Sequence, residues 1–204
     1  IMHLAFYFHS ISKSGGAEKI ITNLINYLSE NDIKIELITF DNPDSESFYF
    51  INKKIIWHKL GYKNKINRFK MAYKILKSKK FNFFVCFNLL DTKSIFFASI
   101  FSNTKLIICE RNGPSIYFIK YNFYERLKIY IILFFSKKIL VQFETYKDKY
   151  PWFLRKKISS IPNPITVNET SNYLINKNDY KILYLGRFDN FQKQVDLIIK
   201  SFFH

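Results

Sequence analysis

Cysteine is scarce in this 204-residue chain. Only Cys86 and Cys109 occur, and both lie inside apolar, strand-like runs. Buried free thiols fit that placement better than a disulfide or a metal site, so no metal is expected. The cysteines therefore indicate a reducing compartment. With 48% hydrophobic and 19% aromatic residues, the chain has the composition of a folded globular protein and not of a disordered one.

Long apolar runs are also missing. The longest spans residues 129–135 between Lys128 and Lys137, far short of the ~20 residues that a membrane-spanning helix needs. The first apolar run, residues 2–8, leads into a polar loop with glycines and not into a small-residue cleavage site, so no signal peptide is visible. We expect a cytoplasmic protein that, where it meets the cell membrane, is peripheral at the inner face.

Acidic residues are too few to balance the basic ones. The chain has 32 Lys and Arg against 16 Asp and Glu, a net charge of +16, and residues 47–90 contain no acid at all. This excess suggests an anionic partner: nucleic acid, an acidic membrane face or a phosphorylated substrate. Compositional drift in an AT-rich genome explains it equally well. No recognisable nucleic-acid module organises the basic residues, so no nucleic acid is expected as a partner.

The acid-free segment predicts a helix over residues 66–77 with two stripes. One is apolar, with Ile66, Phe69, Tyr73 and Leu76, and beside it runs a basic stripe of Lys63, Lys70, Lys74 and Lys77. Such a helix either lies on an anionic membrane surface or packs its apolar side on the core and leaves a solvated basic face. The sequence leaves both interpretations open.

Strand-like and helix-like segments alternate along the chain. Apolar runs predict buried strands at 2–8, 33–40, 81–87, 105–109, 138–142 and 181–186, and helical spacing predicts helices at 17–29, 66–77, 93–101 and within 123–136. This alternation predicts an α/β fold with a doubly wound, Rossmann-like parallel sheet. Ligands of such sheets bind at the carboxyl ends of the strands, which gives weight to the loops after Phe8, Cys109 and Gly186.

Two prolines mark a domain boundary. Pro162 and Pro164 block both helix and central strand, and a polar stretch follows them. We expect an acceptor-side domain over residues 1–160, a linker over 161–179 and the start of a second Rossmann-like domain over 180–204. Because the chain stops at His204 inside a helical pattern, we expect it to be a fragment.

Adjacent glycines stand between the first strand and the first helix. Gly15 and Gly16 let the backbone approach a phosphate, and the helix amino terminus behind them exposes unpaired N–H groups. Glu18 in the first helical turn suits the helix dipole and could cap the loop. Two glycines before a helix are more often a simple turn, so these residues alone do not decide for a ligand site.

Two further polar clusters follow buried strands. Arg187 and Lys193 flank the loop after Gly186, where a guanidinium and an ammonium could neutralise the charge of a departing diphosphate. Glu110, Arg111 and Asn112 follow the strand at 105–109. They could contact acceptor hydroxyls or pair with one another or with nearby lysines.

Two stretches of the chain resemble family 4 retaining glycosyltransferases, which have the GT-B fold. The first loop and helix of that family resemble the stretch SGGAEKIITNLINYL, and the opening of its donor domain resembles the stretch KILYLGRFDNFQKQVDLIIKSF. The resemblance implies that the donor diphosphate is bound by Gly15, Gly16, Arg187 and Lys193. It implies acceptor-side roles for Glu18, Arg111 and Asn112, and a catalytic role for Glu110. Gln194 departs from the family pattern, which often has glycine there.

The family resemblance predicts transfer of a sugar from a nucleoside-diphosphate sugar to a glycan or lipid-linked acceptor, as in the synthesis of bacterial surface polysaccharide or glycolipid. It implies retention of anomeric configuration, no cofactor and no catalytic metal. The family binds sugar and ribose with a glutamate pair that these 204 residues do not supply, so we expect negligible activity from them alone. The alternatives are a sugar-nucleotide epimerase of the same fold and a non-enzymatic basic nucleic-acid binder.

Overall fold

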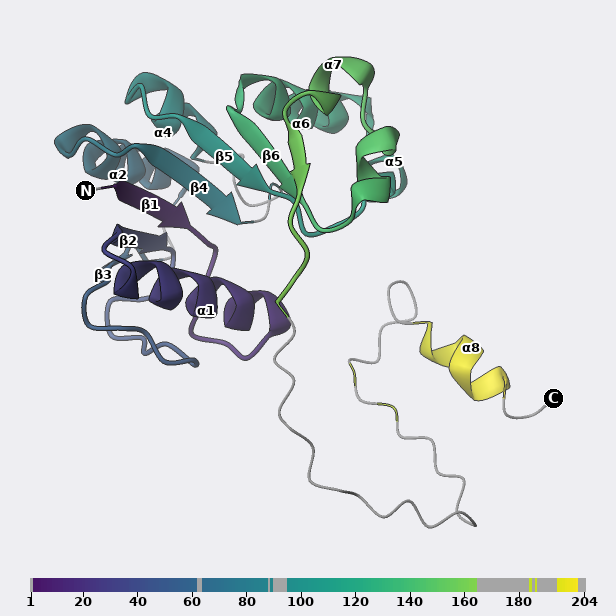
Figure 1. Cartoon of the computed structure of the whole chain (residues 1–204), viewed down its shortest axis with the longest axis horizontal. Coiled ribbons are helices and arrows are strands. Elements are labelled where there is room, and N and C mark those ends of the chain that lie inside the picture. Colours follow the sequence, from purple (N-terminus) through teal and green to yellow (C-terminus); the bar gives the residue numbers. More distant parts are fainter. Residues whose placement is uncertain are drawn as a thin grey trace, which may run out of the picture. The chain divides into compact units, whose positions relative to one another are not determined.

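A parallel sheet of seven strands is the centre of the computed structural model, which describes residues 2–61, 64–87, 89, 95–164, 184, 186 and 194–201. The strand order is β3-β2-β1-β4-β5-β6-β7 (Figure 1). The strands are β1 His3–Tyr7, β2 Lys34–Thr39, β3 Ile56–Lys59, β4 Phe83–Phe87, β5 Leu106–Cys109, β6 Lys138–Val141 and β7 Ile158–Ser160. All pairs are parallel, and the order reverses between β1 and β4. The predicted doubly wound sheet is confirmed.

Helices connect the strands, and one more, α8, comes after β7 in the sequence. They are α1 Gly16–Glu30, α2 Lys65–Ser78, α4 Phe96–Phe101, α5 Ser115–Lys120, α6 Phe123–Phe135, the 3-10 helix η1 Glu144–Lys149, α7 Trp152–Arg155 and α8 Val195–Lys200. Asparagine starts two of them: the side chains of Asn64 and Asn122 accept hydrogen bonds from backbone N–H groups three residues on, at 2.9 and 3.0 Å. These caps satisfy donors that a helix start leaves unpaired.

Each face of the sheet carries its own apolar core. On one face, Ile21 and Ile25 of α1 pack with Phe6 and Leu37 of the inner strands. On the other face, helices α2, α4 and α6 cover the sheet, as with Leu76 of α2 (Figure 1). Strands buried on both faces are apolar at nearly every position, which is why their sequence predicts them.

The structure distinguishes between the two interpretations of the apolar and basic stripes of helix α2. Leu76 is buried, and Phe69 and Tyr73 pack against the core, while Lys70 and Lys74 are exposed. Ile66, at the start of the helix, is 66% exposed. The rest of the apolar stripe faces the protein, which is the core-facing arrangement with a solvated basic side. Lys77 is also exposed, and Lys63 lies outside the described residues.

The chain forms two compact units, Ile1–Pro164 and Ile165–His204. In the second unit the structure describes α8, which buries Val195, and Gln194 just before it. Gln194 has φ 48° and ψ 44°, in the left-handed region that costs other residues energy and glycine almost none. That conformation explains why glycine suits the position. The predicted strand at 181–186 lies mostly outside the described residues.

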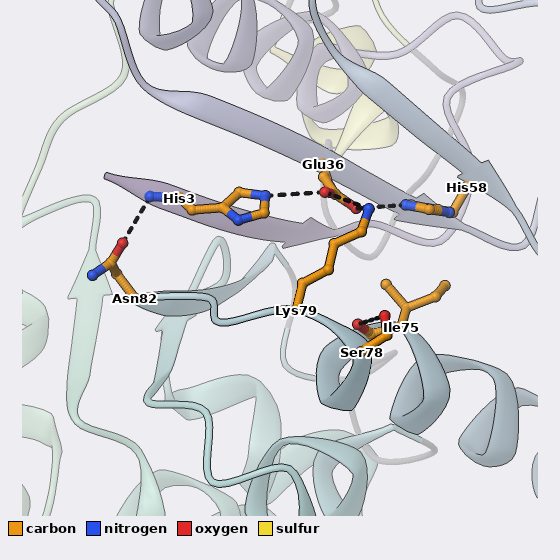
Figure 2. A network of polar contacts seen from close by, with 7 residues as sticks. All are labelled: His3, Glu36, His58, Ile75, Ser78, Lys79 and Asn82. Carbon is orange, nitrogen blue, oxygen red and sulfur yellow. Dashed lines mark hydrogen bonds and ion pairs between the residues drawn. The ribbon is translucent and has the colours of Figure 1, made fainter. Parts of the chain in front are cut away.

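A buried ion cluster ties the sheet to the end of α2 (Figure 2). The side chain of Glu36 in β2 is fully buried; it meets Nε2 of His3 at 3.0 Å, Nε2 of His58 at 2.7 Å and Nζ of Lys79 at 2.7 Å. Asn82 accepts a hydrogen bond from the backbone N–H of His3 at 2.7 Å. Four segments distant in sequence are thereby fastened together. His3 is the first residue of β1 and Lys79 follows α2, so this part of the cluster lies at the amino ends of the strands, while His58 lies near the carboxyl end of β3.

Candidate functional site

The carboxyl ends of β1, β4 and β5 lie side by side, at the point where the strand order reverses (Figure 1). Ligands of open α/β sheets bind at such a point. The loop after β1, Leu89 after β4 and Glu110 after β5 all reach this edge. Ile11 of the first loop shares one apolar cluster with Phe87 and Cys109. The topology thus brings the predicted Gly15 and Glu110 regions to one side of the sheet.

The two glycines differ in their surroundings. A Cβ atom added to Gly15 would lie 2.0 Å from Oε2 of Glu18, so the Glu18 carboxylate folds back over the loop. A Cβ atom added to Gly16 would meet nothing within 4 Å. Gly16 is the first residue of the 15-residue helix α1, whose unpaired N–H groups carry partial positive charge. An anion therefore has an open approach at Gly16, while Glu18 occupies the space at Gly15.

Asp41 fixes the loop that leads to these glycines, a role that the sequence did not reveal. Its carboxylate accepts hydrogen bonds from Oγ of Ser10 at 2.5 Å and from the backbone N–H of Ile11 at 3.0 Å. Burial raises the pKa of Asp41, but these hydrogen bonds outweigh that effect and hold it below its ordinary value. A charged carboxylate at the end of β2 thus positions the loop after β1.

Glu110 is a buried carboxyl group with one oxygen unused. The residue is 2% exposed, and its Oε1 accepts a long hydrogen bond of 3.4 Å from the backbone N–H of Leu89. Within the part of the chain that the structure describes, Oε2 has no partner. Burial raises the pKa of Glu110 from 4.5 to about 8, so the group is mostly protonated at neutral pH. As the structure stands, Glu110 holds the backbone after β4.

Two buried tyrosines add further unused polar atoms. Tyr117 and Tyr150 are each 1% exposed, and neither hydroxyl has a partner among the described residues. Burial raises the pKa of Tyr150, and the nearby charge of Glu110 raises it further. Buried polar groups without partners are costly and rare. Tyr150 lies close enough to Glu110 to interact with its charge, so two neighbouring buried groups have unsatisfied polar atoms, a pattern that favours a functional site.

Arg111 does not pair with Glu110. Its guanidinium carbon lies 5.4 Å from the ring centroid of Phe87. With the Gln142 amide turned so that its oxygen faces the guanidinium, that oxygen accepts from two Arg111 nitrogens at 3.3 Å each. Asn112 is half-buried beside them. Of the alternatives that the sequence left open, pairing of Glu110 with Arg111 is not what the structure has: Arg111 is held between an aromatic ring and an amide.

Arg187 and Lys193 lie outside the described residues, so their predicted diphosphate role stays a prediction. For the described part of the chain, no group of three His, Cys, Asp or Glu side chains is arranged to hold a metal ion. None of its helices combines the length and hydropathy needed to cross a bilayer.

No family model and no curated protein matches the chain. Solved structures do. A lipopolysaccharide outer core galactosyltransferase, WaaB, matches with a TM-score of 0.60 and 16% identity, over 82% of this chain and 47% of its own. Anabaena HepE in complex with UDP-glucose matches at 0.58 and 11%, over 81% and 44%. MurG of Acinetobacter baumannii matches at 0.57 and 11%, over 83% and 47%.

The fold is that of a GT-B amino-terminal domain. The chain spans less than half the length of these neighbours. The same architecture occurs in a UDP-N-acetylglucosamine 2-epimerase from Rickettsia bellii, with a TM-score of 0.51 and 8% identity over 79% of this chain. At such low identities the likeness establishes the fold, and the site residues must carry the argument about chemistry.

Proposed function

We propose that this chain is the acceptor-side part of a glycosyltransferase that moves a sugar from a nucleoside-diphosphate sugar to a glycan or lipid-linked acceptor. The observation that carries the proposal is the open backbone at Gly16, at the start of a long helix and at the reversal point of the sheet. The fold neighbour HepE holds UDP-glucose or UDP in its complexes. A diphosphate is the anion that such a helix terminus favours.

In this proposal the residues divide into three groups. Gly15 and Gly16 meet the donor diphosphate together with Arg187 and Lys193, and no metal takes part. Glu18, Arg111 and Asn112 face the acceptor, with Arg111 held in place by Phe87 and Gln142. Glu110 has the proposed catalytic role, which requires its covered, mostly protonated carboxyl to become accessible to the acceptor.

The resemblance to retaining enzymes makes retention of anomeric configuration part of the proposal. The test is a proton NMR assay, run on a form of the protein that shows turnover, that follows the anomeric signal of the product from its first appearance. A product with the donor's configuration supports retention, and an inverted product contradicts it. Conversion of the donor sugar to its epimer without any acceptor would instead identify an epimerase, the activity that one fold neighbour has by name.

Filling the space at Gly16 should block the diphosphate without harming the fold. We expect Gly16→Leu to weaken binding of UDP-glucose by about tenfold or more, because the new side chain occupies the approach to the helix N–H groups. Its melting temperature should stay within a few degrees of the parent, since Gly16 is exposed and a Cβ there meets nothing. The measurement is a titration followed by amide chemical shifts, repeated with EDTA.

Asn23→Leu is the matched control for this titration, because it adds the same side chain to an exposed position of the same helix. We expect it to leave binding unchanged. In the parent chain the amides of Gly16, Arg187 and Lys193 should shift with one common dissociation constant. Two results would contradict the proposal that the loop at Gly16 and the loop with Arg187 and Lys193 share a diphosphate. One is a set of shifts confined to one of these loops, and the other is equal binding by both leucine variants.

A further inference from the structure

The surface formed by α5, α6 and α7 is apolar although it faces outward. We define the α5–α7 surface by its exposed apolar side chains, which are Phe118, Phe123, Tyr124, Ile131, Phe135 and Trp152. Trp152 is 80% exposed and Tyr124 is 73% exposed. Soluble monomers rarely expose a contiguous apolar patch of this kind unless it is an interaction site.

Helix α6 shows why the surface is apolar. Ile129, Ile132 and Leu133 face the core and are buried, as one stripe of a surface helix should be. Phe134 and Phe135 on the other side are 53% and 60% exposed. A helix that is apolar on both sides needs a second partner besides its own core.

The surface is also hollowed. A groove of about 430 Å³ runs between α6 and α7. Its lining includes Leu127, Ile131, Phe134, Phe135, Trp152 and Phe153. Phe134 and Phe153 join the two helices, with ring centroids 6.4 Å apart. The three helices lie together towards the β6–β7 end of the sheet, away from α1 and β3 (Figure 1). A single continuous face is therefore available to a partner.

Cations border this apolar face. The guanidinium carbon of Arg126 lies 5.0 Å from the Phe118 ring, and Nζ of Lys157 lies 5.1 Å from the Phe134 ring. Lys128 and Lys156 are exposed nearby. Residues 115–157 contain ten Lys and Arg against three Asp and Glu, a net charge of +7. Like charge on both sides opposes pairing with a second copy of this chain, whereas an anionic surface is complementary.

We propose that the α5–α7 surface docks on an anionic lipid bilayer, with Trp152 and its apolar neighbours in the interface and the bordering cations on the headgroups. Exposed tryptophan and tyrosine suit the interfacial region of a membrane. Apolar burial and attraction to anionic lipid act together in peripheral binding. Helix α2 supplies exposed lysines but turns its apolar stripe inward, so the lipid face differs from the one that the sequence suggested.

The test is sedimentation of the 204-residue chain with two kinds of vesicle, one of phosphatidylcholine alone and one that also contains phosphatidylglycerol. We expect binding to the anionic vesicles that weakens with added salt, and much weaker binding to the neutral ones. Trp152→Ser should lower the partition coefficient about tenfold or more. Phe50→Ser is the matched control, since Phe50 is 74% exposed and its carbonyl contacts α1; it should change binding less than about twofold.

Charge-reversal variants distinguish membrane binding by the α5–α7 surface from membrane binding by the basic side of α2. Lys156→Glu should weaken binding to anionic vesicles roughly fivefold for each unit of charge changed. Lys74→Glu makes the same change on α2 and should leave binding nearly unaltered. A larger effect from Lys74→Glu, or equal binding to neutral vesicles, overturns the proposal.

A fluorescence reading localises the contact. Trp57→Phe leaves Trp152 as the single tryptophan, and its emission should shift to the blue when anionic vesicles are added. An unshifted emission overturns the proposal. A concentration-dependent dimer that Trp152→Ser abolishes, in a chain that binds no vesicles, would assign the surface to self-association instead. None of these variants touches the Gly16 region, so their outcome is independent of donor binding.

Discussion

Replacing Glu110 with glutamine stabilises the protein at alkaline pH, by roughly 3 kcal/mol near pH 9. The pKa of Glu110 rises from 4.5 to about 8 on burial, so the folded protein holds a proton that the unfolded chain has already released. Stability from this group is complete below pH 4.5 and is lost as the pH rises through 8. A pKa change of one corresponds to about 1.4 kcal/mol, which puts the upper bound on the order of 5 kcal/mol. Glutamine stays neutral throughout and avoids the loss.

The measurement is urea unfolding of the parent and Glu110→Gln at several pH values. The two stabilities should agree near pH 4, diverge steadily from about pH 4.5 upward and differ by a constant amount above about pH 8. Asp41→Asn is the matched contrast, because Asp41 is 1% exposed but has its hydrogen bonds satisfied and its pKa lowered. That substitution should destabilise at neutral pH. A Glu110→Gln protein that is less stable than the parent at alkaline pH would show that the carboxylate has a partner and is not isolated.

The inner strands were predictable because burial on both faces makes them apolar throughout. The run 2–8 contains β1 and the run 81–87 contains β4, each extended by one or two residues. Two edge strands were not predicted. Strand β3, Ile56–Lys59, is half-exposed and lies in a basic stretch, and β7 has only three residues, two of them serine. An edge strand has one neighbour, so its sequence is under less pressure to be apolar.

The residues of the candidate site likewise fall into those that the sequence pattern indicates and those that it does not. Gly15, Gly16 and Glu110 were found because each follows a strongly patterned strand or precedes a patterned helix. Asp41 and Tyr150 were missed, because their roles depend on contacts with residues 31 and 40 positions away. Spacing in sequence carries no signal for such contacts. Only the strand order brings the end of β2 to the loop after β1.

The sequence carries a signal for the α5–α7 surface. The run 129–135 is too short for a membrane span and falls within the predicted helix at 123–136. Its second property is that apolar residues continue around the helix, from Ile129 inside to Ile131 outside. In a surface helix this indicates a second apolar contact. To find such a surface from the sequence, the positions of apolar residues around the helix are more informative than the length of the apolar run.

Glu36→Gln is expected to destabilise the protein by roughly 2–4 kcal/mol at neutral pH. The substitution removes the negative charge that His3, His58 and Lys79 share, and it leaves their polar groups with a neutral amide (Figure 2). Burial raises the pKa of Glu36, but the hydrogen bonds from Lys79 and His58 outweigh it, so the pKa lies below its ordinary 4.5. The stabilisation is therefore present above pH 4.5 and disappears as the pH falls through the lowered value.

His3 adds to the acid sensitivity of the same cluster. Burial lowers the pKa of His3 below 6.5, against the opposing effects of its hydrogen bond to Glu36 and the charge there. Unfolding then takes up a proton at pH values just below 6.5, and stability falls as the pH drops through that window. His3→Asn should reduce the loss of stability just below pH 6.5. The further loss of stability below pH 4.5, which comes from protonation of Glu36, should remain.

A double-mutant cycle with Lys79→Met measures how strongly Glu36 and Lys79 are coupled. We expect about 1–2 kcal/mol, because the Lys79 ammonium lies 2.7 and 2.8 Å from the two carboxylate oxygens. The comparison is Glu125→Gln in α6, where an exposed pair with Lys128 at 3.1 Å should contribute less than about 0.5 kcal/mol. Equal losses from the two glutamine substitutions would mean that burial adds nothing to the Glu36 cluster. A larger loss at Glu36 would show that the buried cluster, which links β1, β2, β3 and the end of α2, contributes more to stability than an exposed ion pair does.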